Sequence, residues 1–284
     1  MNFCSKSPSK TGYLQSTDQI PIFYRYFEAK NERATVLLVH GLGEHSGRYS
    51  HVIEKLQNEG FTVWCLDLRG HGNSYGLKGD VKDFSCYEDD VLSALKFVQK
   101  TIKKSEKIFI LAHSMGALIS LRLMEKHRPA INGMVLSCPL FALKMPVPKW
   151  KMRAVFAVAN FLPTARVKTN IKGAHLSKDR AFANSYDKDP LVLKSLSVRA
   201  AREIYKGYQE VDSLADNISS AFLLQLAGKD PVVDPVAAQD FFDRATKKDI
   251  DATLKVYPNC LHEIYNEIER EQAIDDAILW LKNH

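Results

Sequence analysis

Residues 107–121, KIFILAHSMGALISL, join two apolar runs through a turn of small residues. The first run is short and β-prone, as a buried strand is, and the second, from Met115 on, has the apolar spacing of a helix. Ser114 lies between them, with Ala112 and Gly116 two residues away on either side. This arrangement is nearly the G-x-S-x-G turn, which presents a serine side chain at a sharp strand-to-helix corner. We therefore predict that Ser114 is a nucleophile around which the rest of the chain is organised.

Length and composition narrow the class of protein. The chain has 284 residues, of which 45% are hydrophobic, and this suits one large α/β domain, with or without an insertion. The net charge of +6 is mildly basic, without the dense basic stripe of a nucleic-acid-binding protein, so we expect no nucleic-acid partner. The cysteines show no paired spacing and are Cys4, Cys65, Cys86, Cys138 and Cys260. This dispersed set predicts reduced thiols, without a disulfide framework or a zinc site.

The apolar segments of the chain are short. None approaches the roughly 20 apolar residues of a membrane-spanning helix. The first residues, MNFCSKSPSKTG, lack the apolar core of a secretory signal. We expect a cytoplasmic protein whose membrane contact, if it has any, is peripheral.

Strand and helix patterns alternate on both sides of Ser114. We expect a hairpin from strands at 13–16 and 20–29, buried strands at 35–39, 61–66, 108–112 and 133–137, and further strands at 221–227 and 252–257. We expect helices at 49–59, 83–104, from 115 onward, at 235–244 and at 267–282. This alternation predicts a mostly parallel, doubly wound sheet with an antiparallel start.

The alternation stops at Pro139 and resumes near residue 218. The intervening residues show no clear strand pattern, and prolines divide them into short helical pieces. Ligands of such sheets bind at the carboxyl ends of the strands, so we expect the insertion to cover the site. The expected organisation is a first core part at 11–138, a helical cap at 139–217 and a second core part at 218–284.

A nucleophilic serine needs a base, and the base needs an orienting carboxylate. One known chain order for these groups is serine, acid and then histidine. Asp230 directly follows the expected strand at 221–227, and His262 lies just beyond the last expected strand. Asp234 is the alternative acid, but Asp230 stands closer to the strand end. We predict that Ser114, Asp230 and His262 form a catalytic triad.

Two backbone N–H groups should stabilise the negative oxygen that forms during attack on an ester. We predict the N–H of Met115, which follows the nucleophile, and that of Leu42 in the glycine turn HGLG at 40–43. We expect His113 to be a packing or hydrogen-bonding neighbour rather than the base. Cys260 is expected to be a small buried residue, although it could be a modifiable thiol near the site.

Six motifs carry a resemblance to a known family. They are HGLGEHSGRY (40–49), DLRGHGNS (67–74), AHSMG (112–116), YDKDPLV (186–192), GKDPVVD (228–234) and LHEIYNE (261–267). Together they resemble the monoacylglycerol lipase and lysophospholipase group of α/β-hydrolases, also described as serine aminopeptidase-like hydrolases. The resemblance runs from about Tyr13 to the C-terminus. The one departure in the nucleophile motif is Ala112, where the family usually has glycine.

The resemblance implies an α/β-hydrolase fold with a mobile helical cap over an apolar tunnel. It places Ser114, Asp230 and His262 in the triad, and the N–H groups of Leu42 and Met115 in the oxyanion hole. By the same resemblance, Glu44 and Arg48 occupy positions that support the glycine turn. The implied activity is hydrolysis of monoacylglycerols or lysophospholipids, without a cofactor or a metal.

The expected cap has an unusual charge pattern. Between residues 141 and 178 there is no Asp or Glu, whereas lysines and arginines alternate with aromatic and aliphatic residues. Such a segment suits an anionic membrane surface. A helix that packs on the core and has a solvated basic rim fits equally well, and the two are compatible.

The function expected from the sequence is cleavage of carboxylic esters of single-chain lipids, with monoacylglycerol as the first candidate substrate. A lysophospholipase or a general carboxylesterase is the alternative. A peptidase is a weaker alternative because the cap has no acidic cluster to hold a free amino terminus. A non-catalytic binding protein would normally lack a member of the triad. The sequence leaves the oligomeric state open.

Overall fold

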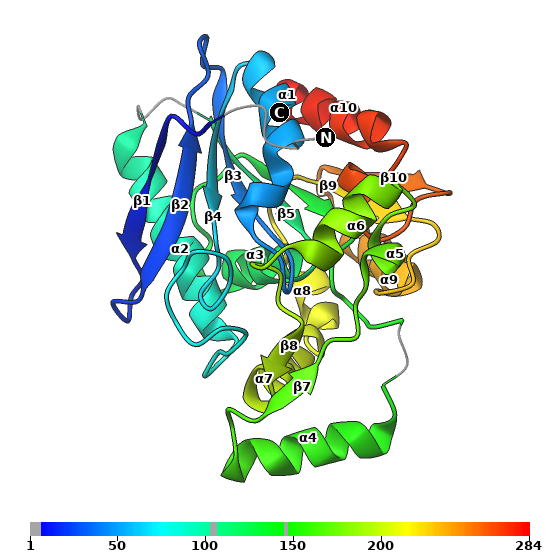
Figure 1. The fold of residues 1–284 in the computed structure, drawn as a ribbon. Coiled ribbons are helices and arrows are strands. Elements are labelled where there is room, and N and C mark those ends of the chain that lie inside the picture. The colour runs from blue at the N-terminus through cyan, green and yellow to red at the C-terminus, as the bar shows by residue number, and fades with distance from the viewer. Residues whose placement is uncertain (1–6, 103–106, 145–146) are drawn as a thin grey trace.

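An eight-stranded sheet runs through the molecule in the computed structural model, which describes residues 7–102, 107–144 and 147–284 (Figure 1). The strand order is β1-β2-β4-β3-β5-β6-β9-β10. The strands are β1 Lys10–Gln15, β2 Pro21–Phe27, β3 Ala34–Val39, β4 Phe61–Leu66, β5 Lys107–His113, β6 Gly133–Ser137, β9 Phe222–Ala227 and β10 Ala252–Tyr257. β2 is antiparallel to both β1 and β4, and the other neighbouring pairs are parallel. The predicted mostly parallel sheet with an antiparallel start is confirmed.

Helices cover both faces of the sheet. They are α1 Ser50–Asn58, α2 Ser85–Thr101, α3 Met115–His127, α9 Pro235–Ala245 and α10 Arg270–Asn283, with short 3-10 turns at Ser46–Tyr49 and Ile264–Asn266. α1 contacts α10, while α2 and α9 belong to a second group with α3 and α8 (Figure 1). Every residue of β3, β4, β6 and β9 is buried, as strands covered on both faces require.

Two helices begin clearly later than predicted. The helix predicted at 83–104 begins at Ser85, and the Asp83 carboxylate accepts the Ser85 N–H at 2.9 Å just before the first turn. Its predicted last residues, 103 and 104, lie outside the described residues. The last helix begins at Arg270 rather than at 267, and the Glu267 carboxylate accepts the N–H of Leu261 at 2.8 Å.

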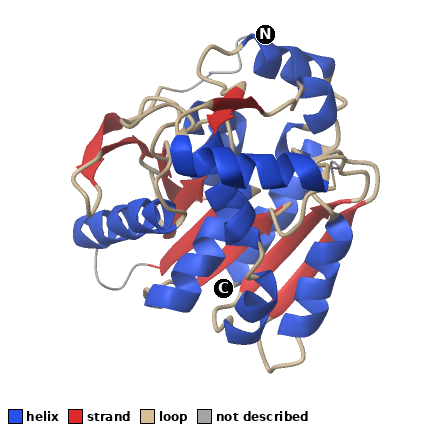
Figure 2. Cartoon of the chain, turned by 90° about the horizontal axis from the view of Figure 1, so that it is seen from below, coloured by secondary structure: helices blue, strands red, loops and turns tan. Residues whose placement is uncertain are grey.

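Residues 139–217, here called the inserted segment, lie between β6 and β9 in sequence. They contain α4 Lys149–Phe161, β7 Arg166–Lys168, α5 Gly173–Leu176, α6 Arg180–Lys188, β8 Ser195–Ser197, α7 Val198–Tyr208 and α8 Val211–Asn217. β7 and β8 form a separate antiparallel pair, so the expectation of no strand here is wrong. Strands of three residues are too short to show a periodic pattern. α4 packs against α7 and lies farthest from the sheet (Figure 1). Seen from below, helices lie across the strands of the sheet (Figure 2).

The described ranges contain no helix long and apolar enough to cross a membrane. Cys65, Cys86, Cys138 and Cys260 are free thiols, in line with the predicted reduced state, and Cys4 lies outside the described residues.

Candidate active site

Ser114 occupies the corner between β5 and α3. Its backbone has φ +52° and ψ −116°, a conformation that residues other than glycine rarely adopt. Such strain persists only where the surroundings enforce it, and it is typical of functional sites. A Cβ atom at Gly116 would lie 2.5 Å from the Val39 carbonyl oxygen, so the glycine at this position is required. Ala112, by contrast, is fully buried inside β5, where the methyl group is accommodated.

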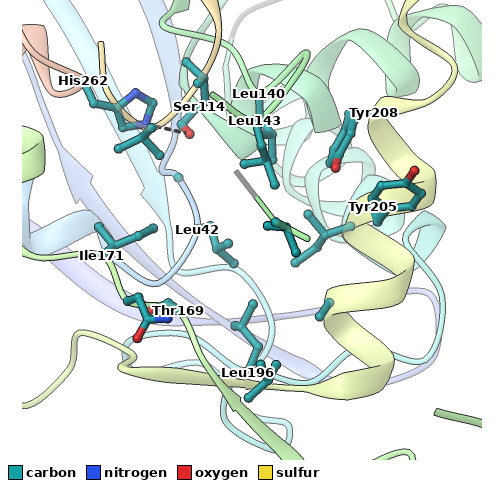
Figure 3. Close-up of a pocket in the computed structure, with 18 of the residues that line it drawn as sticks. Leu42, Ser114, Leu140, Leu143, Thr169, Ile171, Leu196, Tyr205, Tyr208 and His262 are labelled. Atoms are coloured by element: carbon teal, nitrogen blue, oxygen red, sulfur yellow. Dashed lines mark hydrogen bonds between the residues drawn. The ribbon is translucent and has the colours of Figure 1, made fainter. Parts of the chain in front are cut away.

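The structure brings Ser114, His262 and Asp230 together from three separate strand ends. His262 Nε2 lies 3.0 Å from Ser114 Oγ (Figure 3). Its Nδ1 lies 2.7 Å from Asp230 Oδ2. The other Asp230 oxygen accepts the N–H groups of Val232 and Val233 at 2.8 and 3.0 Å. The aspartate is therefore held in place, and it orients the imidazole so that Nε2 faces the serine hydroxyl.

Burial and neighbouring charges shift the pKa values of Asp230 and His262 in opposite directions. Burial alone would raise the pKa of Asp230, but the charge and hydrogen bond of His262 and the two backbone N–H groups lower it below 3.8. Burial alone would lower the pKa of His262, but the Asp230 carboxylate raises it above 6.5. The carboxylate therefore stabilises an imidazolium at this position, as a general base requires when it accepts a proton.

The N–H groups of Leu42 and Met115 lie on the two segments that meet at Ser114. A Cβ atom at Gly41 would lie 3.1 Å from Ser114 Cβ, which shows how closely the glycine turn approaches the serine. Met115 is the first residue of α3, where a backbone N–H has no partner within the helix. Neither N–H has a hydrogen-bond acceptor within the described part of the chain. Both can therefore donate to an external oxygen.

His113 is a buried neighbour of the site, as predicted. Its Nδ1 lies 3.3 Å from Ser137 Oγ, and its ring centre lies 4.8 Å from that of His262. Burial, together with the nearby charge of His262, lowers the pKa of His113 to about 4. His113 is therefore neutral at physiological pH and does not compete with His262 for a proton.

A buried network of charges supports the glycine turn. Glu44 accepts the Gly41 N–H and the Tyr49 hydroxyl, both at 2.7 Å, and pairs with Arg48 at 3.0 Å. Arg48 also binds the carboxylate of Glu263 through two nitrogens, at 2.6 and 2.8 Å. Burial opposes ionisation of Glu44, but the charges of Arg48 and of the nearby histidines, together with the Gly41 N–H, outweigh it and lower the pKa to about 2. The support role implied for Glu44 and Arg48 agrees with these contacts.

Glu263 was not singled out from the sequence. It follows His262 directly in the LHEIYNE motif, and Asn266 donates to its second oxygen at 2.7 Å. Because Arg48 lies 215 positions earlier in the chain, only the tertiary structure shows that the residue next to His262 is tied to the glycine turn.

A cavity of about 330 Å³ opens beside Ser114 (Figure 3). The apolar side chains of its wall come from both the core and the inserted segment and include Leu42, Leu140, Leu143, Met152, Val155, Val167, Ile171, Leu176, Leu196, Ile204, Val232 and Val233. Lys151, Lys168, Tyr205 and Tyr208 add polar groups on the side of the inserted segment. Such a mostly apolar cavity with few polar groups is typical of a site for an apolar ligand.

The described residues offer one cluster of possible metal ligands, formed by Cys138, Asp230 and His262, whose ligand atoms lie within 4.8 Å of one another. Both ring nitrogens of His262 are already hydrogen bonded. Burial raises the pKa of the Cys138 thiol well above 9.0, so this sulfur stays protonated. Because metals bind neutral imidazole and thiolate, this donor set does not favour a metal. Burial likewise raises the pKa of Cys260 to about 11, so its thiol is not reactive at neutral pH.

Comparison with solved structures shows the α/β-hydrolase fold. The monoacylglycerol lipase of Paleococcus ferrophilus superimposes with a TM-score of 0.82 at 27% identity, over 92% of this chain and 98% of that chain. A soluble variant of monoglyceride lipase from Saccharomyces cerevisiae, solved with a substrate analog, gives a TM-score of 0.87 at 22% identity, over 99% of this chain and 97% of that chain.

Sequence comparison assigns the family. The family model described as serine aminopeptidase, S33, matches residues 30–269, and the chain belongs to this family. The monoacylglycerol lipase of Mycolicibacterium smegmatis is 28% identical, with 89% of each protein covered. Mouse monoglyceride lipase is 29% identical over 90% of this chain and 84% of that protein. An uncharacterised abhydrolase domain-containing protein of Dictyostelium discoideum is 31% identical over 88% of this chain, which spans 26% of that protein.

These likenesses confirm the resemblance seen in the sequence motifs. The chain is a carboxylic ester hydrolase of the α/β-hydrolase fold, in the group that contains the monoacylglycerol lipases.

The raised pKa of His262 predicts the pH dependence of turnover. Only the neutral imidazole can accept the serine proton, so kcat/KM for a soluble ester should fall as the pH drops through the pKa of His262. We expect the midpoint of this fall to lie above 6.5, the ordinary value for histidine. Asp230→Asn should move the midpoint to lower pH and reduce kcat by about four orders of magnitude. Asp234→Asn is the matched control, because asparagine also caps α9. A wild-type midpoint below 6.5 would contradict this assignment.

The tight packing of Gly116 predicts a second effect. Gly116→Ala places a methyl group against two main-chain carbonyls that have little freedom to move. We expect a loss of about 1–3 kcal/mol in the free energy of unfolding, measured by denaturant titration, together with a fall in kcat because the Ser114 corner is displaced. Ala112→Gly, on the strand side of the same corner, should keep wild-type kcat. Unchanged stability and activity in Gly116→Ala would show that the corner tolerates the shift.

Proposed function

We propose that this protein hydrolyses esters of single-chain lipids, with monoacylglycerol as its main substrate class, and uses Ser114, His262 and Asp230 as its catalytic triad. One observation carries the proposal: the hydrogen-bonded chain from Asp230 through His262 to Ser114 ends at the wall of an apolar cavity. The relatives named monoacylglycerol lipase and monoglyceride lipase support this choice of substrate.

The proposed reaction proceeds through an acyl-enzyme. His262 Nε2 takes the proton of Ser114 Oγ, which attacks the ester carbonyl carbon, and the carbonyl oxygen becomes an oxyanion held by the N–H groups of Leu42 and Met115. His262 then protonates the leaving glycerol oxygen as the ester bond breaks. Water, activated by His262, releases the fatty acid and restores the serine. Each oxyanion donor contributes on the order of 3 kcal/mol to the stability of the transition state.

We further propose that residues 139–217 act as a cap between core parts at 11–138 and 218–284. Side chains from this segment, such as Met152, Val155 and Ile204, line the cavity opposite Ser114. An acyl chain held there would bury its methylene groups at a gain of about 0.8 kcal/mol each. The cap would therefore set the preferred chain length.

A second candidate substrate is a lysophospholipid. Lys151 and Lys168 line the cavity, and within the described ranges neither has an acidic partner. The carboxylates in the wall, Glu44 and Glu263, share one cation, Arg48. Both lysines are exposed, so they place two positive charges at the edge of an apolar cavity, which favours a negatively charged head group. Comparing hydrolysis of a monoacylglycerol with that of a lysophospholipid of the same chain decides between the two.

Substitution of the nucleophile tests the proposed chemistry. Ser114→Ala should abolish hydrolysis of p-nitrophenyl esters and covalent labelling by a fluorophosphonate, because it removes the hydroxyl that is hydrogen bonded to His262. Circular dichroism and the melting temperature should stay close to those of the wild type. Ser120→Ala, a buried serine further along α3, is the matched control and should keep both activities. Labelling of Ser114→Ala at the wild-type rate would refute the assignment.

The surface of the inserted segment predicts contact with anionic lipid. Trp150 and Phe161 on α4 are 67% and 85% exposed, and Lys149 and Arg153 lie on the same helix. Exposed aromatic residues beside cations suit insertion at a membrane interface. Phe161→Ser should weaken sedimentation with phosphatidylserine vesicles several-fold and leave hydrolysis of a soluble acetate ester unchanged. The control is Leu279→Ser, at a 58% exposed site on α10. Equal vesicle binding by the wild type and Phe161→Ser would exclude this surface as the site of contact with lipid.

A further inference from the structure

We propose that the inserted segment positions the oxyanion hole, through a clasp in which Asp189 and Leu193 hold the glycine turn that carries Leu42. The clasp consists of two hydrogen bonds: Leu193 N–H to the Gly43 carbonyl, and His45 to the Asp189 carboxylate. This inference rests on the proposed function, since it assigns a task to residues that act through the Leu42 N–H. Asp189 and His45 are positioning residues that would not touch the substrate.

The backbone half of the clasp is a close contact. The Leu193 N–H donates to the Gly43 oxygen at 2.8 Å. Gly43 has φ +78°, a conformation that favours glycine, and its Cα hydrogens face Leu193, where a Cβ atom would lie 3.4 Å from the Leu193 oxygen. The turn therefore adopts a shape that lets the inserted segment approach its backbone directly.

In the side-chain half of the clasp, the donor and the acceptor of the His45–Asp189 hydrogen bond can be assigned. The Gly47 N–H donates to His45 Nδ1 at 3.2 Å, so the imidazole proton lies on Nε2. Nε2 donates to Asp189 Oδ2 at 2.9 Å. The other oxygen of Asp189 accepts the Leu191 N–H at 2.8 Å, which shapes the loop toward Leu193. One carboxylate thus forms the contact with the core and orders the loop that makes the backbone contact.

The clasp holds the side of the turn that the core leaves without a partner. On one side of Leu42, the Gly41 N–H is held by Glu44 at 2.7 Å. On the other side, the Gly43 carbonyl has its hydrogen bond from Leu193. The Leu42 peptide lies between these two anchors, so its N–H direction depends on both. If the inserted segment released the turn, the Leu42 N–H would no longer point toward the oxyanion.

This role differs from substrate binding in its kinetic consequence. An oxyanion donor acts mainly in the transition state, so misplacing it lowers kcat and leaves KM nearly unchanged. Complete loss of one donor costs about 10²–10³-fold in kcat, and a loosened donor costs less. The loss should be equal for short and long acyl chains, because the clasp does not line the cavity wall used by the chain.

The test compares variants that break the clasp with variants that keep it. Asp189→Asn retains one carbonyl oxygen for either Leu191 or His45 but cannot serve both, and His45→Ala removes the donor. His45→Gln keeps an N–H near the position of Nε2 and is the rescue variant. Lys188→Ala, at an exposed neighbouring site, is the matched control. For each protein, kcat and KM are measured with p-nitrophenyl acetate and with a long-chain ester, together with the inhibition constant of a trifluoromethyl ketone that forms a tetrahedral adduct.

We expect His45→Ala and Asp189→Asn to lower kcat about tenfold on both esters, with KM changed less than twofold. The inhibition constant of the ketone should rise by the same factor as kcat falls. His45→Gln and Lys188→Ala should stay within twofold of the wild type. The loss in the double variant His45→Ala/Asp189→Asn should fall well short of the product of the two single losses, because both variants remove the His45–Asp189 bond. Melting temperatures identify a variant that fails to fold. If one of the two clasp variants fails to fold, the kinetic comparison is made with the other.

The opposite pattern overturns the proposal. A rise in KM for the long-chain ester alone, with acetate turnover and ketone affinity unchanged, would make the loop a substrate-binding element only. Fluorophosphonate labelling of Ser114 in the wild type tests the proposed function separately. If that labelling succeeds and every clasp variant has wild-type kcat, the clasp is excluded and the triad stands. If that labelling fails while the protein is folded, both are excluded.

Discussion

The close approach of the α3 N-terminus to the end of β3 is the contact on which the site depends. Gly116 lies so near the carbonyls of Val39 and His40 that no side chain fits between them. This contact brings the Ser114 corner against the glycine turn, where a Cβ atom at Gly41 would lie 3.1 Å from Ser114 Cβ. The strained backbone of Ser114 is then enforced by the sheet, through the bond from its N–H to the Ser137 carbonyl.

Each buried carboxylate around this contact has a hydrogen-bonded partner. Asp230 binds the His262 ring, and Arg48 lies between Glu44 and Glu263. A buried carboxylate without a partner would cost several kcal/mol and would disturb the protonation of the base. The same pairs also fix geometry, since Glu44 holds Gly41 and Asp230 holds the His262 ring. The electrostatics and the positioning of the site therefore come from one set of residues.

Much of the fold could be predicted from local sequence patterns. The strand at 61–66 and the strand at 252–257 were predicted at their observed bounds, because short runs of β-prone residues between turn residues show a strand directly. Ser114, Asp230 and His262 were chosen because each follows a strand, and parallel strands end at one edge of the sheet. β7 and β8 were missed because three residues carry no periodicity. Glu263 was missed because its partner, Arg48, lies far away in the chain.

The sequence by itself determined the order and type of the core elements and placed the candidate nucleophile, acid and base at strand ends, since these properties depend on the spacing of residues along the chain. Only the tertiary structure decided that Arg48 joins Glu263 to the glycine turn, how the cavity wall is shared, and that His45 meets Asp189 across 144 positions. Those features are contacts between distant segments, and their geometry is set by packing against the sheet, which no local pattern records.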